Sequence, residues 1–278
     1  MIQDLMLPLT NTGGDAHALA AAIALADAWG AHLSVVQPIV IPLPAIGPLG
    51  VVADATTVEL MDTLRDAAET RAVKVRSQLG KAGISWEMRT TEPLFADPFK
   101  ALAHQAGFAD LAVLPAPTQD GDAIARRWFS AMLFESGRPV LAVPARHPIE
   151  LPIRHVVLAW KPTRESTRAL HDALPLLSAA TSIDVVTVDP VASELDEGPV
   201  PGVDVATHLA RHGLQVNLVN LPREGQSVAT VLLRHAVATQ AQLLVAGGYG
   251  HSRLREWALG GTTRELLTAL HLPVLFSH

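Results

Sequence analysis

The chain has 278 residues, of which 49% are hydrophobic and 17% charged, a composition that suits one large folded domain or two smaller ones. Its net charge of −6 and isoelectric point of about 6.0 show that the chain lacks the overall positive charge typical of proteins that bind nucleic acid. The sequence has no cysteine, which excludes disulfides, thiolate catalysis and cysteine-ligated metal.

The first ninety residues give no sign of targeting to a membrane. The N-terminus, MIQDLMLPLT, has no basic residue and does not match a signal peptide, so we expect a cytoplasmic protein. The uncharged stretch at 33–53 is long enough to cross a bilayer, but prolines interrupt it at four places. We predict a strand, LSVVQPI, that runs into a proline-rich loop, and no membrane segment.

The two halves of the chain carry the same order of apolar runs, about 130–150 residues apart. DLMLPL in the first half parallels RHVVLA in the second, ADLAVLPA parallels AQLLVAGG, and RPVLAVP parallels LPVLFSH. A spacing of this size indicates a duplicated domain rather than a solenoid. We predict domains at 1–147 and 152–278, separated near the proline-rich PARHPIELPI.

Within each half, short apolar runs alternate with longer amphipathic ones. In the second half the expected strands are HVVLAW, SIDVVTV, QVNLVN, QLLVAG and PVLFS. Helical spacing of apolar residues occurs between them, in RESTRALHDALPLLSAA and GQSVATVLLRHAVATQ. This alternation predicts an α/β fold in which each half is a five-stranded parallel sheet flanked by helices.

The last strand of each half, PVLAVP or PVLFS, would leave an exposed sheet edge. The two strands can pair with each other, which gives an internal pseudo-dimer, or between chains, which gives a homodimer. Both arrangements remain open at this stage.

Glycines are concentrated just after the fourth predicted strand of the second half. Gly247 ends that strand, Gly250 follows, and Gly260 and Gly261 precede the amphipathic TTRELL. Sheets of this type bind ligands beyond the carboxyl ends of their strands, and a loop without Cβ atoms can bring amides close to phosphate. Thr262 and the glutamate three residues later have capping-box spacing, which predicts a helix N-terminus suited to an anion. For any single glycine, the alternative is that it only forms a turn in an ordinary loop and binds no ligand.

The spacing Gly247-x2-Gly250-x9-Gly260, in LLVAGGYGHSRLREWALGGTTRELL followed by LPVLFSH, resembles the nucleotide-binding signature of universal stress proteins. The first half, with ADLAVLP and FESGRPVLAVP, is similar to the motif-poor domain of tandem members. The resemblance implies two tandem five-stranded parallel-sheet sandwiches of the adenine nucleotide alpha hydrolase-like type, related by a pseudo-twofold axis. It also implies ATP, with or without Mg²⁺, at the second-half glycine loop, a role in stress tolerance, and association through the last strand.

The second half departs from the family pattern at two positions. Gly261 stands where the pattern has a serine or threonine that touches phosphate, and Thr262 or Thr263 can supply the missing hydroxyl. Lys161 lies in the region after the first strand that often carries an acid. It is either a point-charge partner for phosphate or a solvated loop residue.

The corresponding loop of the first half differs more. LPAPTQDGDAIARRWFSAMLF has the single glycine Gly121, and Pro115 and Pro117 stiffen the loop and remove amide donors. After the first strand of this half, Thr10 or Asn11 replaces the acid. We predict that the first half binds no nucleotide in this way.

Geometry then suggests the remaining contacts. Adenine and ribose are expected over the ends of the first two strands of the second half. Phosphates are expected near the residues after Gly250, where the guanidinium group of Arg253 has paired donors that match phosphate oxygens. The complete set of expected nucleotide-binding residues is Trp160, Lys161, Val188, Asp189, Gly247, Gly250, His251, Ser252, Arg253, Gly260, Gly261, Thr262 and Thr263.

Other constellations are weaker. His208 and His212 have a spacing that can hold a metal, but the sequence offers no third ligand nearby, so no metal site is predicted. A hydrolytic triad has no support because no G-x-S-x-G elbow occurs. Three functions stay open: a nucleotide-binding stress-response module, a slow ATPase or phosphotransfer enzyme in which Asp189 coordinates Mg²⁺, and a scaffold that binds no nucleotide.

Overall fold

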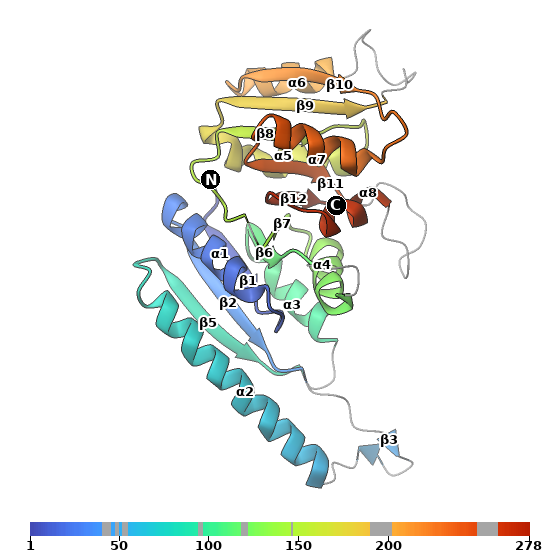
Figure 1. Ribbon diagram of the computed structural model, residues 1–278. Helices are drawn as coiled ribbons and strands as arrows, with labels where there is room; N and C mark the ends of the chain where they lie inside the picture. The colour runs from blue at the N-terminus through green and yellow to red at the C-terminus, as the bar shows by residue number, and fades with distance from the viewer. Residues whose placement is uncertain are drawn as a thin grey trace.

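The computed structural model describes residues 1–40, 46–47, 50–51, 55–93, 97–117, 122–145, 147–189, 202–248 and 261–278. These residues form a central ten-stranded sheet with helices on both faces (Figure 1). A separate two-stranded hairpin, β3 (Ile46–Gly47) with β4 (Gly50–Val51), lies in the proline-rich region and was not predicted.

Each half contributes five strands to the large sheet. In the first half these are β1 (Asp4–Pro8), β2 (His32–Pro38), β5 (Trp86–Thr91), β6 (Leu111–Pro115) and β7 (Val140–Val143). In the second half they are β8 (His155–Ala159), β9 (Ser182–Val188), β10 (Val216–Leu221), β11 (Leu243–Gly247) and β12 (Val274–Ser277). The helices are α1 (Asp15–Trp29), α2 (Ala55–Leu79), α3 (Pro98–Ala106), α4 (Ala123–Glu135), α5 (Arg164–Ala173), α6 (Val203–Arg211), α7 (Val228–Ala238) and α8 (Gly261–Thr268), with the 3-10 helix η1 at Leu174–Ala179.

The strand order is β10-β9-β8-β11-β12-β7-β6-β1-β2-β5. Outward from the middle, both halves therefore place their fifth, fourth, first, second and third strands in the same sequence, and all pairings within a half are parallel. This confirms the prediction of two tandem five-stranded α/β units.

The two last strands pair with each other inside one chain. β12 runs antiparallel to β7, with Val274 opposite Ala142 and Phe276 opposite Val140. Because β12 also pairs with β11 and β7 with β6, neither last strand keeps a free edge for a second chain. Of the two arrangements left open by the sequence, the structure has the internal one.

The hydrophobic cores continue across this seam on both faces of the sheet. α1, α5, η1 and α6 bury their apolar sides on one face, and α3, α4, α7 and α8 on the other. At the seam the rings of Phe129, on α4, and Phe276, on β12, meet edge to face at 5.2 Å. Arg168, on α5, donates to the carbonyl of Gly137 in the other half at 2.8 Å.

Local chemistry explains where the second-half helices begin and end. The predicted helix at 164–180 is split, because Pro175 has no N–H to continue an α-helix, and η1 replaces its last part. The predicted helix at 225–240 becomes α7, whose N-cap Ser227 accepts from the amide of Thr230 at 3.1 Å. The predicted strand LSVVQPI is β2, and no described helix is both long and apolar enough to span a membrane.

Candidate functional site

The strand order of the second half reverses between β8 and β11. β9 and β10 lie to one side of this point and β12 to the other. Open α/β sheets bind ligands beyond the carboxyl ends of their strands at such a switch point. Trp160 and Lys161 follow β8, Val188 and Asp189 lie at the end of β9, and Gly247 ends β11. The structure therefore brings these five predicted residues to one edge of three neighbouring strands.

The residues after β8 form a tight connection to α5. The Trp160 amide donates to the carbonyl of Val186 at 2.8 Å, and its half-buried side chain packs on the core. Lys161 is exposed, and its carbonyl accepts from the amide of Thr163 at 2.7 Å. Thr163 is the N-cap of α5. The lysine amine thus remains at the solvent side of this edge, where a phosphate group can reach it.

Asp189 has a structural role in the connection between β10 and α7. It adopts a left-handed backbone with φ of 45°, and its Oδ1 accepts from the amide of Arg223 at 2.9 Å. Val188, before it, is half-buried on the core. Among the described residues no group of three or more histidine or acidic side chains can hold a metal ion. The described residues therefore supply no metal-binding group around Asp189 that would support the hypothesis that it coordinates Mg²⁺.

Gly247 allows the first turn of α5 to approach β11 closely. A Cβ at this position would lie 2.7 Å from the carbonyl carbon of Glu165 and 2.7 Å from the amide nitrogen of Ser166. Gly248 makes a similar approach to the other half, because its Cβ would lie 2.8 Å from Leu133 on α4. The sequence analysis attributed Gly247 to access of amides to phosphate or to an ordinary loop, whereas the structure shows protein atoms close to the Cβ positions of both glycines.

The other predicted phosphate contacts surround the start of α8. Gly261 is the first residue of the helix, is exposed, and has open space around its Cβ position. Thr262 follows it inside the first turn and is exposed, whereas Thr263 is buried. Thr262 is therefore not the N-cap that the capping box predicted, since the helix already includes Gly261. Five predicted residues lie outside the described part of the chain: Gly250, His251, Ser252, Arg253 and Gly260.

The first half closes the equivalent position differently. Registers pair Leu5 with Leu111 and Val156 with Leu243, so Pro115 occupies the place of Gly247. Across from it stands Gly14, whose Cβ would lie 2.4 Å from Cβ of Pro115. The glycine that permits close approach is on the strand in the second half, and in the first half it is the N-cap of the helix α1. The pyrrolidine ring consequently fills this position in the first half.

A polar network occupies the carboxyl edge of β1 and β2. Asp15, on α1, accepts from the amide and hydroxyl of Thr10 at 2.9 and 2.6 Å and from the amide of Asn11 at 2.9 Å. Burial raises the pKa of Asp15, although these hydrogen bonds oppose the shift. Gln37, fully buried, donates to Asn11 at 3.0 Å. Side chains of the protein thus fill the first-half edge where the second half has Lys161 and a short turn.

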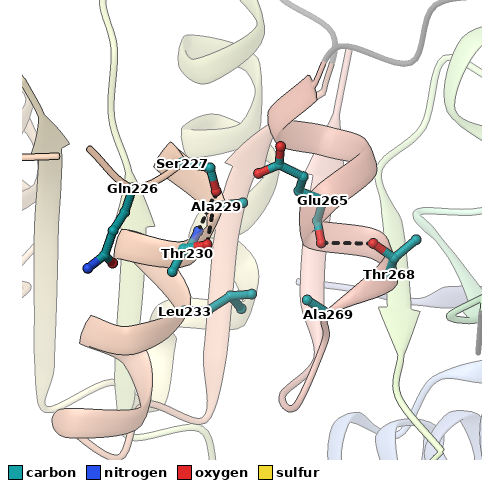
Figure 2. A pocket seen from close by; sticks show the side chains of 8 residues that line it. All are labelled: Gln226, Ser227, Ala229, Thr230, Leu233, Glu265, Thr268 and Ala269. Atoms are coloured by element: carbon teal, nitrogen blue, oxygen red, sulfur yellow. Dashed lines mark hydrogen bonds between the residues drawn. The ribbon is translucent and has the colours of Figure 1, made fainter. Parts of the chain in front are cut away.

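A hollow of about 370 Å³ lies between α7 and α8 (Figure 2). Of the described residues that line it, Ala229 and Leu233 are apolar and Glu265 is the one with a charge. The Ser227 hydroxyl bonds to Thr230 at 2.9 Å, and Thr268 donates to the carbonyl of Glu265 at 3.3 Å, so these hydroxyls serve their own helices. The described part of this lining has a carboxylate and no cation, which does not suit a polyphosphate, and it includes none of the predicted residues that the structure describes.

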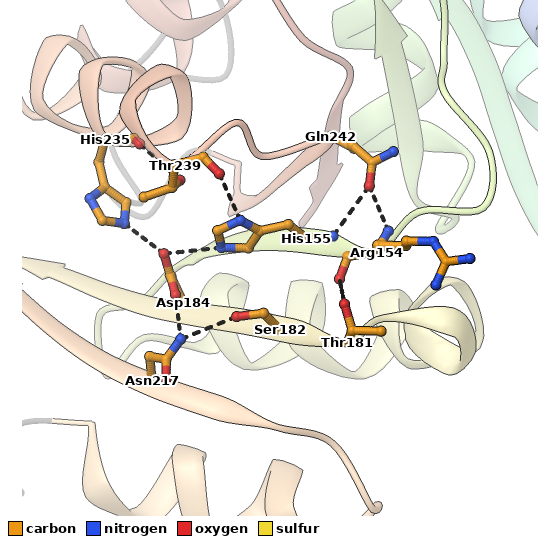
Figure 3. A network of polar contacts seen from close by, with 9 residues as sticks. All are labelled: Arg154, His155, Thr181, Ser182, Asp184, Asn217, His235, Thr239 and Gln242. Carbon is orange, nitrogen blue, oxygen red and sulfur yellow. Dashed lines mark hydrogen bonds and ion pairs between the residues drawn. The ribbon is translucent and has the colours of Figure 1, made fainter.

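The structure adds a third member to the histidine pair that the sequence showed, and it contains a second cluster that sequence reasoning missed. His171, on α5, stacks edge to face with His208 at 5.3 Å, and His208 with His212 at 4.8 Å. Burial, followed by the charges of His212, His171 and Arg211, lowers the pKa of His208. In the second cluster, His155 and His235 both face Asp184 inside the sheet–helix interface (Figure 3). An acid in the middle of the apolar strand SIDVVTV was the signal for that cluster.

Fold and topology together define a tandem, doubly wound α/β protein with one switch point in each half. Residues 152–278, the second half of the chain, match the model of the Universal stress protein family. No curated protein matches the sequence.

Solved structures share the fold over the whole chain. A universal stress protein from Archaeoglobus fulgidus DSM 4304 has a TM-score of 0.71 at 17% identity, covering 99% of this chain and 95% of its own. A protein of unknown function from Pseudomonas aeruginosa PAO1 has a TM-score of 0.59 at 16% identity, covering 99% and 92%. The tandem arrangement therefore occurs in other proteins with very different sequences.

Proposed function

We propose that the chain is a cytoplasmic stress-response module that binds an adenine nucleotide, ATP, in its second half. The phosphates would lie against the first turn of α8 and the glycine loop before it, and adenine and ribose beyond the ends of β8 and β9. Nucleotide binding would change the conformation of the module or its choice of partner, which requires unequal affinity for two states.

The observation that carries the proposal is the exposed first residue of α8, Gly261, in the half that contains the β8–β11 switch point. Among the described residues nothing lies within 4 Å of the Cβ position of Gly261, which leaves room for a ligand beside the first residue of the helix. Helix N-termini attract anions through unpaired N–H groups and the helix dipole. Lys161, exposed at the same sheet edge, adds a cation.

The first half, residues 1–147, would be a domain that binds no nucleotide and supports residues 152–278. Two features favour this division: Pro115 fills the space against Gly14, and Asp15 and its partners occupy the edge beyond β1. The seam between β7 and β12 joins the domains, and Leu133 of the first half occupies the space where Gly248 would carry a Cβ.

Calorimetric titration of the full chain with ATP tests the proposal. We expect a dissociation constant in the micromolar range, about −8 kcal/mol. Gly250→Leu is expected to abolish binding because its side chain would occupy phosphate space, whereas Gly121→Leu, in the corresponding first-half loop, is expected to leave affinity unchanged. Unchanged affinity in Gly250→Leu would show that the site is misplaced, and absence of binding by the wild type would favour the scaffold hypothesis.

An ATPase or phosphotransfer activity is the second candidate. The position of Asp189 at the carboxyl edge favours it, since a carboxylate there has a second oxygen besides the one that accepts the Arg223 amide. Phosphate release above background by the wild type, lost in Gly250→Leu, would establish the enzyme. ATP binding without phosphate release would favour the nucleotide-binding module over the enzyme.

A further inference from the structure

Helix α4 of the first half places two side chains against the second half. Phe129 and Leu133 lie one turn apart on the same face of α4, and both are almost completely buried. Phe129 packs on Phe276 of β12, and Leu133 fills the space beside Gly248, where a Cβ would lie 2.8 Å from its Cδ2. Gly248 directly follows β11 and begins the glycine-rich stretch of the proposed nucleotide site. The first half therefore reaches the point where β11 leads into that site.

The backbone of Gly248 is held by the end of β12. Its amide donates to the carbonyl of Ser277 at 2.8 Å, and its carbonyl accepts from Nδ1 of His278 at 3.1 Å. The His278 ring in turn lies edge to face with Phe134 of α4, with 4.8 Å between ring centroids. Both polar backbone groups of Gly248 are thus bonded within the second half, while α4 borders this residue through Leu133 and its partner His278 through Phe134.

Comparison with the first half shows what the glycine is needed for. The residue after the fourth strand is Ala116 there, and its amide donates to the carbonyl of Val143 at 2.8 Å, just as Gly248 donates to Ser277. The backbone of Gly248 is not in the left-handed region, so an alanine could adopt its conformation. Among the described residues, Leu133 is the side chain that occupies the place of the missing methyl group. The glycine and the leucine therefore form a matched pair across the seam.

We propose that α4 of the first half regulates the nucleotide site of the second half, because Leu133 holds Gly248 where phosphate binding requires it. This inference rests on the proposed function, since it concerns the same site. Leu133 is a positioning residue and does not touch the nucleotide. Hydrogen bonds from main-chain amides to phosphate depend on distances of about 2.7–3.1 Å, so a displacement of about 1 Å at the start of the glycine loop weakens them. The first half, which binds no nucleotide in our proposal, would thereby set the affinity of its neighbour.

Calorimetric titration of the full chain with ATP tests the role of Leu133. We expect Leu133→Ala to bind ATP about 3- to 30-fold more weakly than the wild type, the range found for coupling through residues that do not touch the ligand. Leu133→Met keeps the space beside Gly248 filled and is expected to retain wild-type affinity within about twofold. Unchanged affinity in Leu133→Ala would overturn the proposal.

Leu102→Ala is the matched control for lost stability. Leu102, on α3, is fully buried in the same hydrophobic core as Leu133, so its truncation also opens a cavity in the first half. We expect this variant to bind ATP like the wild type at a temperature where circular dichroism shows both variants to be folded. An equal loss of affinity in Leu102→Ala and Leu133→Ala would show a general effect of destabilisation and would overturn the proposal.

A double variant tests whether the two residues act on each other. Gly248→Ala is expected to weaken ATP binding, because its methyl group would collide with Leu133 and displace the start of the glycine loop. Leu133→Ala removes the obstructing atoms, so the double variant should bind ATP more tightly than Gly248→Ala alone. Losses that simply multiply in the double variant would contradict the contact.

Amide hydrogen exchange followed by NMR gives a readout that needs no nucleotide. We expect the Gly248 amide to exchange faster in Leu133→Ala than in the wild type, relative to the amide of Val245 inside β11, whereas Leu102→Ala should change both amides together. An unchanged ratio in Leu133→Ala would show that Leu133 does not hold Gly248. Absence of ATP binding by the wild type would overturn the proposed function and the regulatory role with it, and the exchange ratio would still decide whether α4 positions this residue.

Discussion

Replacing Gly247 with alanine should destabilise the protein even in the absence of any nucleotide. The added methyl carbon would lie 2.7 Å from two backbone atoms of α5, the carbonyl carbon of Glu165 and the amide nitrogen of Ser166. Non-bonded carbon atoms pack at about 3.5–4.0 Å, so strand β11 and helix α5 must separate by roughly 1 Å. Because the obstructing atoms belong to the backbone and cannot rotate away, we expect a loss of about 1–3 kcal/mol in the free energy of unfolding, toward the upper end of that range.

Urea unfolding followed by circular dichroism measures this loss, with Gly261→Ala as the matched control. Gly261 also belongs to the predicted nucleotide site, but nothing lies within 4 Å of its Cβ position and it is the first residue of α8. Alanine there should leave stability unchanged or raise it by up to about 1 kcal/mol. A Gly247→Ala variant within about 0.5 kcal/mol of the wild type would refute the argument that this glycine is required for packing.

Two further predictions concern stability. Gly14→Ala should cost about 1–3 kcal/mol, because its Cβ would lie 2.4 Å from Cβ of Pro115, and the double variant with Pro115→Gly should recover part of that loss; additive effects in the urea titration would contradict the contact. Asp184→Asn should cost about 1–3 kcal/mol at pH 7, because it removes the charge that faces two histidines. Since the folded-state pKa of Asp184 is lowered, its contribution is present above the unfolded value of about 3.9 and is lost as the pH falls through the folded value, so the difference from wild type should narrow below about pH 4. A difference that stays constant from pH 7 to 3 would show that the carboxylate charge plays no part.

Much of the fold could be predicted because the second-half strands are continuous apolar runs buried on both faces. SIDVVTV is β9 residue for residue. Three of the other predicted strands differ from the observed ones by one residue at one end, and QVNLVN differs from β10 by one residue at each end. The helix at 164–180 was less accurate, since the pattern of apolar residues continues through Pro175 while the hydrogen bonding changes there. Periodicity reports which face is buried and says less about the type of helix.

Which edges of the two sheets meet could not be predicted. PVLAVP and PVLFS are equally suited to pairing within one chain or between two, because backbone groups form the ladder and their composition is nearly the same. The choice depends on how the two units fit together, for example through Phe129 and Phe276 at the seam. That is a property of the tertiary structure.

The candidate site was located by sequence, but its residues were not all explained by it. The strand ends at Lys161, Asp189 and Gly247 do lie at one sheet edge, as expected. The side-chain partners of Asp189 and the helix that approaches Gly247 were not visible, because both come from segments distant in the sequence. For the same reason His155, Asp184 and His235, which are spread over about eighty residues, were not recognised as a cluster.

The most direct test of the central claim is a crystal structure of the full chain grown with ATP. We predict triphosphate density against the first-turn amides of α8, at Gly261–Thr263, with the adenine ring beyond the carboxyl ends of β8 and β9. Density for the nucleotide beside Pro115 in the first half or in the hollow between α7 and α8 would contradict the account, as would crystals whose second-half edge holds no nucleotide at saturating ATP.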